Sequence, residues 1–347
     1  MKRFPIAASA AIGISVAIAA AALPASSATA AQQRKPAVHT ITVGSNPIDI
    51  VVSARRSKGY VANDGSVSVL SLAAHKQLAE VGTGFHDQTA LGLVRCDTQA
   101  YITTFDLNVV KVLSTRSLKV TKTIKVGAGA TDVVAARTRA GEDAYVTLLQ
   151  SEGTVGAAAV VQTSSGKVIK TIKLPAGAQT ATTTPDNKHV WVGSVESGVV
   201  WVISTATQKI VRRIPVTKSG PVSSIAFNPR GTRAWVFGLG GMSVVNVATG
   251  KVLSFIPVTT IFPASAAPNA GPVALTRSGR YALAVDSTVP DNPARGTVAV
   301  ISTRTLKVVS SVRVGTEPIG LAIDYRRQTA YVTNYEDDTV SYFKIPR

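Results

Sequence analysis

The sequence predicts an all-β fold, a seven-bladed β-propeller with four-stranded blades, and three observations support it. One strand pattern, an aromatic residue followed by apolar and small residues, recurs seven times at spacings of 41 to 50 residues, the period of a propeller blade. Each repeat also holds short segments rich in β-branched residues and bounded by Gly, Pro, Asn or Ser, which is typical of strands. No segment keeps a helical period for more than two turns.

The aromatic strand marks the same place in every repeat. Its copies begin at Tyr60, Tyr101, Tyr145, Trp191, Trp235, Tyr281 and Tyr331. An apolar strand precedes it, a strand of period two follows it, and a Lys- and Val-rich strand ends each unit. That last strand often closes on a Val-Gly pair, as at Val43-Gly44, Val81-Gly82 and Val314-Gly315.

The ends of the chain predict how the ring closes. The seventh repeat stops after its third strand, Thr339 to Ile345, and the chain opens with a lone strand of the fourth type, Val38 to Val43. We expect that strand to complete the seventh blade, because pairing the two ends removes the last open sheet edges. The domain organisation predicted is a signal peptide at 1–30, a short tail at 31–37 and the propeller at 38–347.

The first residues predict the compartment. Met1-Lys2-Arg3 is basic, the stretch from Ile6 to Leu23 is apolar, and Ala28-Thr29-Ala30 supplies small residues for cleavage, the pattern of a secretory signal peptide. A membrane anchor is the alternative for this stretch. We expect a secreted, extracytoplasmic protein associated with the cell envelope. The single cysteine, Cys96, excludes an internal disulfide, and after an apolar run it is expected to be buried.

The seventh repeat resembles a known family. Tyr331-Val332-Thr333-Asn334 and the following Thr339-Val340-Ser341 are similar to the repeats of the YVTN family of β-propellers, and the likeness extends over Val38 to Arg347. The resemblance implies the propeller fold and an extracytoplasmic, often surface-associated protein. It implies no activity. Repeats four and six depart from the family pattern, with Ser204 and Ser302 where Asp is usual.

The charges of this basic chain, +18 overall, sort by sign once the strand order of a propeller is applied. Turns between the first and second and the third and fourth strands of each blade share one face, the basic face, to which we assign 21 basic and 5 acidic residues. The remaining connections form the acidic face, with 13 acidic and 2 basic residues. The basic face is expected to dock on an anionic polymer or membrane surface. The docking candidates are Arg55, Arg56, Arg230, Arg233, Arg326 and Arg327.

The acidic face surrounds the channel mouth and is expected to bind a ligand or a protein partner. The ligand-binding candidates are Asp49, Asp87, Asp132 and Glu317. His86 beside Asp87 is a candidate general base, although a polar loop residue is the simpler interpretation. The histidines do not recur at matched positions, and the sequence contains no G-x-S-x-G elbow and no phosphate-binding loop.

These observations favour a monomeric, non-enzymatic binding or scaffold protein. No cofactor is predicted, and a divalent cation held by carboxylates stays an alternative. One alternative function is a channel-mouth enzyme that resembles propeller lyases and lactonases and uses a divalent metal. Another is a protein that binds single-stranded nucleic acid, which the low aromatic content of 5% disfavours.

Overall fold

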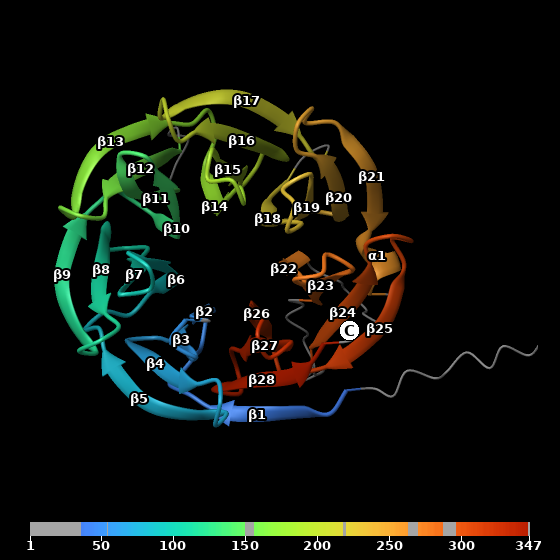
Figure 1. Ribbon diagram of the computed structural model, residues 1–347, viewed down its shortest axis with the longest axis horizontal. Coiled ribbons are helices and arrows are strands. Elements are labelled where there is room, and N and C mark those ends of the chain that lie inside the picture. The colour runs from blue at the N-terminus through green and yellow to red at the C-terminus, as the bar shows by residue number, and fades with distance from the viewer. Residues whose placement is uncertain are drawn as a thin grey trace, which may run out of the picture. The chain divides into compact units, whose positions relative to one another are not determined.

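Seven four-stranded antiparallel sheets surround a central channel in the computed structural model (Figure 1). The structure describes residues 36–53, 55–149, 156–217, 220–262, 270–286 and 296–345. This architecture confirms the predicted seven-bladed propeller. The predicted signal peptide at 1–30 lies outside the described residues, as does nearly all of the predicted tail at 31–37.

Each of the first six blades is built from four consecutive strands, numbered from the channel outward. Blade 1 comprises β2 (Asp49–Ser53), β3 (Lys58–Ala62), β4 (Ser66–Ser71) and β5 (Lys76–Gly82). Blade 2 comprises β6 (Gln88–Val94), β7 (Gln99–Thr104), β8 (Val109–Ser114) and β9 (Lys119–Lys125). Blade 3 comprises β10 (Ala130–Thr138), β11 (Gly141–Leu148), β12 (Ala157–Gln162) and β13 (Lys167–Lys173).

The second half of the ring repeats this order. Blade 4 comprises β14 (Ala178–Thr183), β15 (His189–Ser194), β16 (Val199–Ser204) and β17 (Lys209–Pro215). Blade 5 comprises β18 (Val222–Phe227), β19 (Arg233–Gly238), β20 (Gly241–Asn246) and β21 (Val252–Pro257), and the short helix α1 (Val258–Ile261) follows it. Blade 6 comprises β22 (Ala270–Leu275), β23 (Tyr281–Asp286), β24 (Thr297–Ser302) and β25 (Val308–Arg313).

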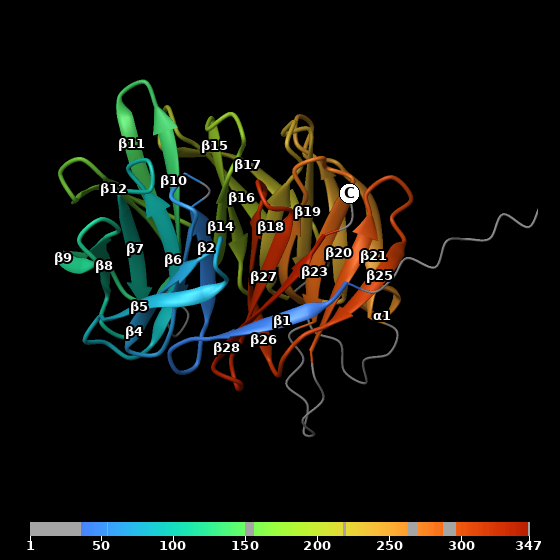
Figure 2. The same cartoon turned by 60° about the horizontal axis from the view of Figure 1, so that its bottom comes forward.

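The seventh blade joins the two ends of the chain. It comprises β26 (Pro318–Asp324), β27 (Thr329–Asn334), β28 (Thr339–Lys344) and, on the outside, β1 (Val38–Thr42). The β1 and β28 strands lie side by side and pair from Val38 opposite Phe343 to Thr42 opposite Thr339 (Figure 2). The pairing confirms the predicted closure, and it leaves blade 7 with as many strands as its neighbours.

The core is divided into seven clusters, each of which fills the space between two adjacent blades. The aromatic residue of one blade packs against the next blade: Tyr60 of blade 1 lies with Leu91 and Ile102 of blade 2. Side chains in the middle strands are therefore buried on both faces, whereas the outer strand β5 alternates between exposed and half-buried positions. Burial of this aromatic residue contributes about 2–3 kcal/mol at an interface that has one, and it positions the blade on its neighbour.

Repeat six follows a different register from the one its sequence suggests. Tyr281 lies at the start of β23 opposite Ser302, the place that Arg233 occupies opposite Asn246 in blade 5. Leu283 is fully buried in the cluster between blades 6 and 7 and takes the aromatic position. The predicted motif start at Tyr281 is therefore wrong by two residues, because the buried slot accepts a large apolar side chain of either kind.

Cys96 is exposed, and the prediction that it is buried is wrong. The apolar run ends with β6 at Val94, and the turn to β7 begins at once. Arg95, Cys96 and Asp97 have φ angles of 53°, 54° and 63°, so three successive residues adopt the left-handed conformation. This tight turn directs the thiol away from the sheet.

The Val314-Gly315 pair after the outer strand of blade 6 meets Asn334, the last residue of the YVTN pattern in blade 7. The Gly315 amide donates to Asn334 Oδ1 at 3.0 Å, and Asn334 Nδ2 donates to the hydroxyls of Thr339 and Ser341 at 2.9 Å each. A Cβ atom on Gly315 would lie 2.5 Å from Asn334 Cγ. Glycine is needed here because the backbone approaches a buried, fully engaged amide.

A Gly315→Ala variant is therefore expected to be less stable than the wild type by about 1–3 kcal/mol, because the methyl group overpacks this contact. Gly82→Ala is the matched control, since a Cβ on the corresponding glycine of blade 1 meets nothing within 4 Å. Urea unfolding of both variants measures the difference. Equal stability of the two variants would contradict the close-approach explanation.

Candidate functional site

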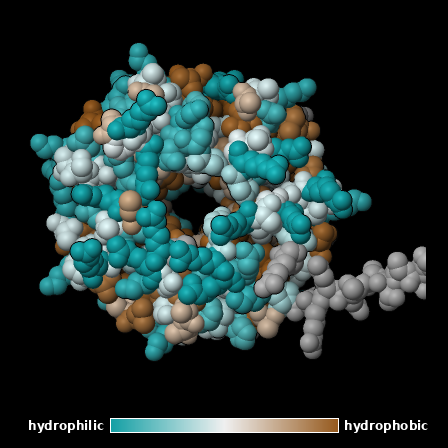
Figure 3. Space-filling model, viewed as in Figure 1, coloured by the Kyte–Doolittle hydropathy of each residue, from teal (hydrophilic) through white to brown (hydrophobic). Residues whose placement is uncertain are grey.

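The basic face consists of the turns β2–β3, β4–β5 and their equivalents in the other blades. The structure places all six docking candidates on it: Arg55 and Arg56 in the β2–β3 turn, Arg230 and Arg233 at β18–β19, and Arg326 and Arg327 at β26–β27. Figure 3 shows the molecule from this side, where hydrophilic side chains gather around the central opening. The blades thus bring together arginines that are up to 272 residues apart in the sequence.

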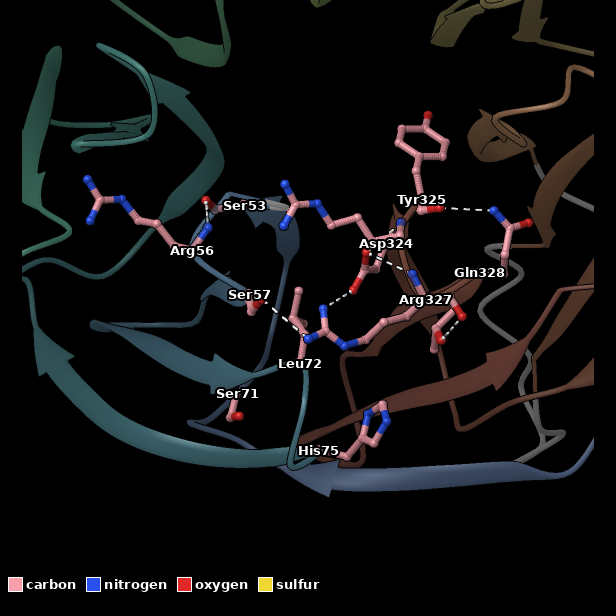
Figure 4. A network of polar contacts seen from close by, with 12 residues as sticks. Ser53, Arg56, Ser57, Ser71, Leu72, His75, Asp324, Tyr325, Arg327 and Gln328 are labelled. Atoms are coloured by element: carbon pink, nitrogen blue, oxygen red, sulfur yellow. Dashed lines mark hydrogen bonds and ion pairs between the residues drawn. The ribbon is translucent and has the colours of Figure 1, made fainter.

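Two of the six arginines are fixed within the ring. Arg327 donates from Nη1 to Asp324 Oδ2 at 2.9 Å and from Nη2 to Ser57 Oγ at 3.3 Å, and so links blade 7 to blade 1 (Figure 4). Asp324 is fully buried, and the amides of Arg326 and Arg327 also donate to it. Arg56 donates from Nε to the carbonyl of Asp97 at 2.7 Å and links blade 1 to blade 2. These two side chains support the ring itself.

The other four arginines are free to meet a partner. Arg55, Arg230, Arg233 and Arg326 are exposed. None of the four forms an ion pair with another described residue; on this face the ion pairs join Arg137 to Glu142, Lys188 to Asp186 and Arg327 to Asp324. The structure therefore separates docking candidates from structural arginines, a distinction that the sequence alone did not provide.

The acidic face consists of the β3–β4 turn, the β5–β6 connection and their equivalents. Eight of the acidic residues assigned to it from the sequence lie in these connections: Asp64, Asp87, Asp106, Glu196, Glu317, Glu336, Asp337 and Asp338. Asp49 and Asp132 lie instead in β2 and β10, and Asp286 is the last residue of β23. The two basic residues assigned to it, Lys218 and Arg295, lie outside the described residues, as do Glu152 and Asp291. The described connections of this face therefore carry acidic side chains and no Lys or Arg, although Lys125, Lys173 and Arg313 end the outer strands beside them.

Two of the predicted ligand residues, Asp49 and Asp132, join neighbouring blades along the channel wall. Asp49 Oδ2 accepts the amide of Leu91 in blade 2 at 2.9 Å, and Oδ1 accepts the amide of Ile50 at 2.8 Å. Asp132 repeats the arrangement two interfaces further on, between blades 3 and 4. Its Oδ2 accepts the Ala181 amide and the Thr180 hydroxyl of blade 4, and its Oδ1 accepts the Val133 amide.

Burial acts on both of these carboxyl groups. Each side chain is partly open to the channel, yet the carboxyl lies among protein atoms, and this desolvation is the main cause that raises the pKa of Asp49 and brings the pKa of Asp132 to about 6. The negative charge of Asp49 raises the pKa of Asp132 further, whereas the amide hydrogen bonds lower it. Asp49 and Asp132 therefore connect neighbouring blades through hydrogen bonds to backbone amides.

The other sequence candidates lie apart from one another. His86 is exposed, and its Nδ1 lies 2.9 Å from Asp64 Oδ1, so the structure pairs it with a turn of blade 1 and not with its neighbour Asp87. Glu317 lies in the connection from blade 6 to blade 7, where burial and then the charge of Glu336 raise its pKa. Of the four ligand candidates, Asp87 lines the pocket described next.

That pocket lies on the acidic face where blades 7, 1 and 2 meet. Its walls include Asp64, Asp87, Gln88, Asp106 and Tyr335. Sequence reasoning missed the grouping of Asp64 and Asp106, although both follow the aromatic strand of their repeats at nearly the same place, as does Tyr335 in the seventh repeat. Comparison of that position across repeats would have found it.

Among the described residues, no group of three or more His, Cys, Asp or Glu side chains is arranged to hold a metal ion. Among the same residues, no helix has the length and apolar character needed to span a membrane.

Comparison with known proteins identifies the fold. No family model and no curated protein matches the sequence. A solved structure of Kuenenia stuttgartiensis hydrazine synthase resembles the chain with a TM-score of 0.76 and 17% identity, over 86% of this chain and 96% of that one. The β-propeller domain of Cps50 (Swd1) from Myceliophteria thermophila gives a TM-score of 0.70 and 12% identity, over 89% and 100% of the two chains. At such low identity, the likeness establishes a β-propeller fold and does not establish a function.

The buried Asp132 carboxyl predicts a pH dependence of stability. Because its folded pKa of about 6 lies above the ordinary value near 4, the folded state favours the protonated form, and stability is lost as the pH rises between these values. The free energy of unfolding of the wild type should therefore fall by about 1–2 kcal/mol relative to Asp132→Asn between about pH 4 and 6.5.

Denaturant unfolding at several pH values measures this difference. Asp106→Asn, which removes an exposed carboxylate from the same face, is the control and should follow the wild type. Parallel curves for the wild type and Asp132→Asn over this range would show that the Asp132 carboxyl is not perturbed in the fold.

Proposed function

We propose that this protein is a secreted, monomeric YVTN-type repeat protein that acts as a binding or scaffold protein of the cell envelope, with its basic face docked on an anionic polymer. The observation that carries the proposal is the set of exposed arginines that lack ion-pair partners among the described residues. They project from blades 1, 5 and 7 on one side of the ring: Arg55, Arg230, Arg233 and Arg326.

Dispersed charges suit a partner whose negative groups repeat. Each exposed arginine adds a modest, screened attraction, and several of them on one rigid face act together. A polymer with regularly spaced phosphates or carboxylates can meet arginines on separate blades at once. Such docking gains strength from the number of contacts, so it weakens steeply as salt is added.

The apolar side chains of this face favour a polymer over a lipid bilayer. Surface-bound proteins commonly insert large apolar residues between headgroups. On the basic face, Tyr325 is the large hydrophobic residue that is well exposed in the described structure, and the others lie on outer strands or acidic-face turns, such as Phe255 on β21 and Leu239. The basic face therefore presents charge and little exposed apolar area to a partner.

A fourfold arginine variant tests the proposal. Retention of the mature protein on immobilised linear polyphosphate should fall at least roughly tenfold at low salt, because the exposed charges that act additively are removed. The changes to Gln are made at Arg55, Arg230, Arg233 and Arg326. The structural arginines Arg56 and Arg327 are kept, so that the ring is not weakened.

A second fourfold variant is the matched control. It removes equal charge from exposed positions on the outer strands β9, β13, β17 and β25, far along each strand from the basic face: Lys125, Lys173, Arg213 and Arg313 changed to Gln. It should be retained nearly as well as the wild type. Equal losses in both variants would reduce the binding to net charge alone and contradict docking by this face.

The same assay distinguishes the alternative partners. Stronger binding to phosphatidylglycerol vesicles than to polyphosphate would contradict the polymer and assign the face to a membrane surface. Stronger binding to a single-stranded oligonucleotide of equal charge would favour the nucleic-acid alternative, in which bases stack on an exposed aromatic ring such as Tyr325.

A further inference from the structure

The pocket on the acidic face concentrates negative charge in a small space. It has a volume of about 350 Å³, and its described lining includes the carboxylates of Asp64, Asp87 and Asp106 and no basic side chain. Burial is the main cause that raises the pKa of the Tyr335 phenol in its wall, and the negative charges of Glu317, Glu336 and Asp64 raise it further. A cation is the species that this environment stabilises.

A buried hydrogen-bond acceptor without a partner lies in the same wall. Gln88 is 2% exposed, and its Nε2 donates to Thr83 Oγ1 at 2.7 Å. Its Oε1 has no hydrogen-bond partner in the described structure. Because an unpaired buried carbonyl is unfavourable, the position is one that a donor on a ligand would improve. This acceptor is independent of the three carboxylates, and an N–H group of a ligand is a donor that it could accept.

The form of the pocket favours an organic cation over a metal ion. Among the described residues, no group of three His, Cys, Asp or Glu side chains is placed to hold a metal ion. The walls also include the rings of Phe105 and Tyr335, and aromatic rings attract ammonium and guanidinium groups. Separate carboxylates, an amide acceptor and aromatic rings match a small molecule with N–H donors and an apolar stem.

We infer that this pocket binds an organic ammonium or guanidinium group, which is either a free aliphatic amine or the basic side chain of a partner protein. The inference rests on the proposed function, because a protein docked by its basic face presents the acidic face, with this pocket, to a ligand. The recognition is divided by chemistry. Asp64, Asp87 and Asp106 supply charge, Gln88 Oε1 accepts a hydrogen bond, and the rings of Phe105 and Tyr335 contact the apolar part.

Isothermal titration calorimetry of the mature protein with 1,4-diaminobutane tests the inference. Saturable binding at one site is expected, weakened about two- to fivefold by Asp87→Asn or Asp106→Asn alone and about tenfold by both, since each removes one partly screened attraction. Both carboxylates are exposed and make no hydrogen bond given by the described structure, so the variants should fold. Glu196→Gln removes one exposed charge from the same face outside the pocket and should bind like the wild type.

A Gln88→Met variant tests the buried acceptor separately. With folding verified by circular dichroism, it should bind the diamine about three- to tenfold more weakly, because the ligand loses a hydrogen bond to a buried group. An acetylated peptide with one lysine between glycines is the second ligand. Binding of either ligand that depends on the pocket supports the inference, and the tighter of the two identifies a free amine or a protein side chain as the source.

Three results would overturn the inference. They are no binding of either ligand at millimolar concentration, equal binding by the wild type and the Asp87→Asn/Asp106→Asn variant, and displacement of the diamine by Mg²⁺ at lower concentration than by another amine. None of these results bears on the polyphosphate assay, which depends on the opposite face. Failure of the pocket and failure of the docking surface are therefore distinguishable.

Discussion

Backbone pairing between β1 and β28 is the interaction on which the rest of the ring depends. Without β1, blade 7 would have three strands and an open edge, and the cluster between blades 7 and 1 would lose Ile41 and Val43. Side chains reinforce the junction: Asp338 Oδ1 accepts the Asn46 amide at 2.8 Å, and Arg327 connects to Ser57. Closure lets every blade pack on two neighbours, so no interface has to be stable alone.

The turns carry the groups that the ring offers for recognition. The aromatic residues are buried between blades, and the carboxyls of Asp49 and Asp132 accept amides across blade interfaces of the channel wall. The turns on one face carry exposed arginines, whereas those on the other carry carboxylates and the pocket beside Gln88. Alternation of strand direction within each blade therefore separates two chemistries on a single rigid body.

Periodicity made the fold predictable, because seven repeats of β-branched segments with one aromatic strand admit few arrangements. Contacts across blades were not predictable in the same way. Three features depend on how adjacent blades pack, which the sequence of a single repeat does not show. They are the pairing of His86 with Asp64, the ion pair between Arg327 and Asp324, and the burial of the Asp132 carboxyl against blade 4. Leu283 occupies the position of the aromatic residue in blade 6, because the space between blades accepts any large apolar side chain.

The claim that two faces serve two purposes is tested most directly by hydrogen exchange of the protein docked on polyphosphate. The account predicts slower exchange in basic-face turns that carry the exposed arginines, at 55–57, 229–232 and 325–328, and unchanged exchange in acidic-face turns at 63–65 and 105–108. Protection of the acidic-face turns, or equal protection of both faces, would contradict the account.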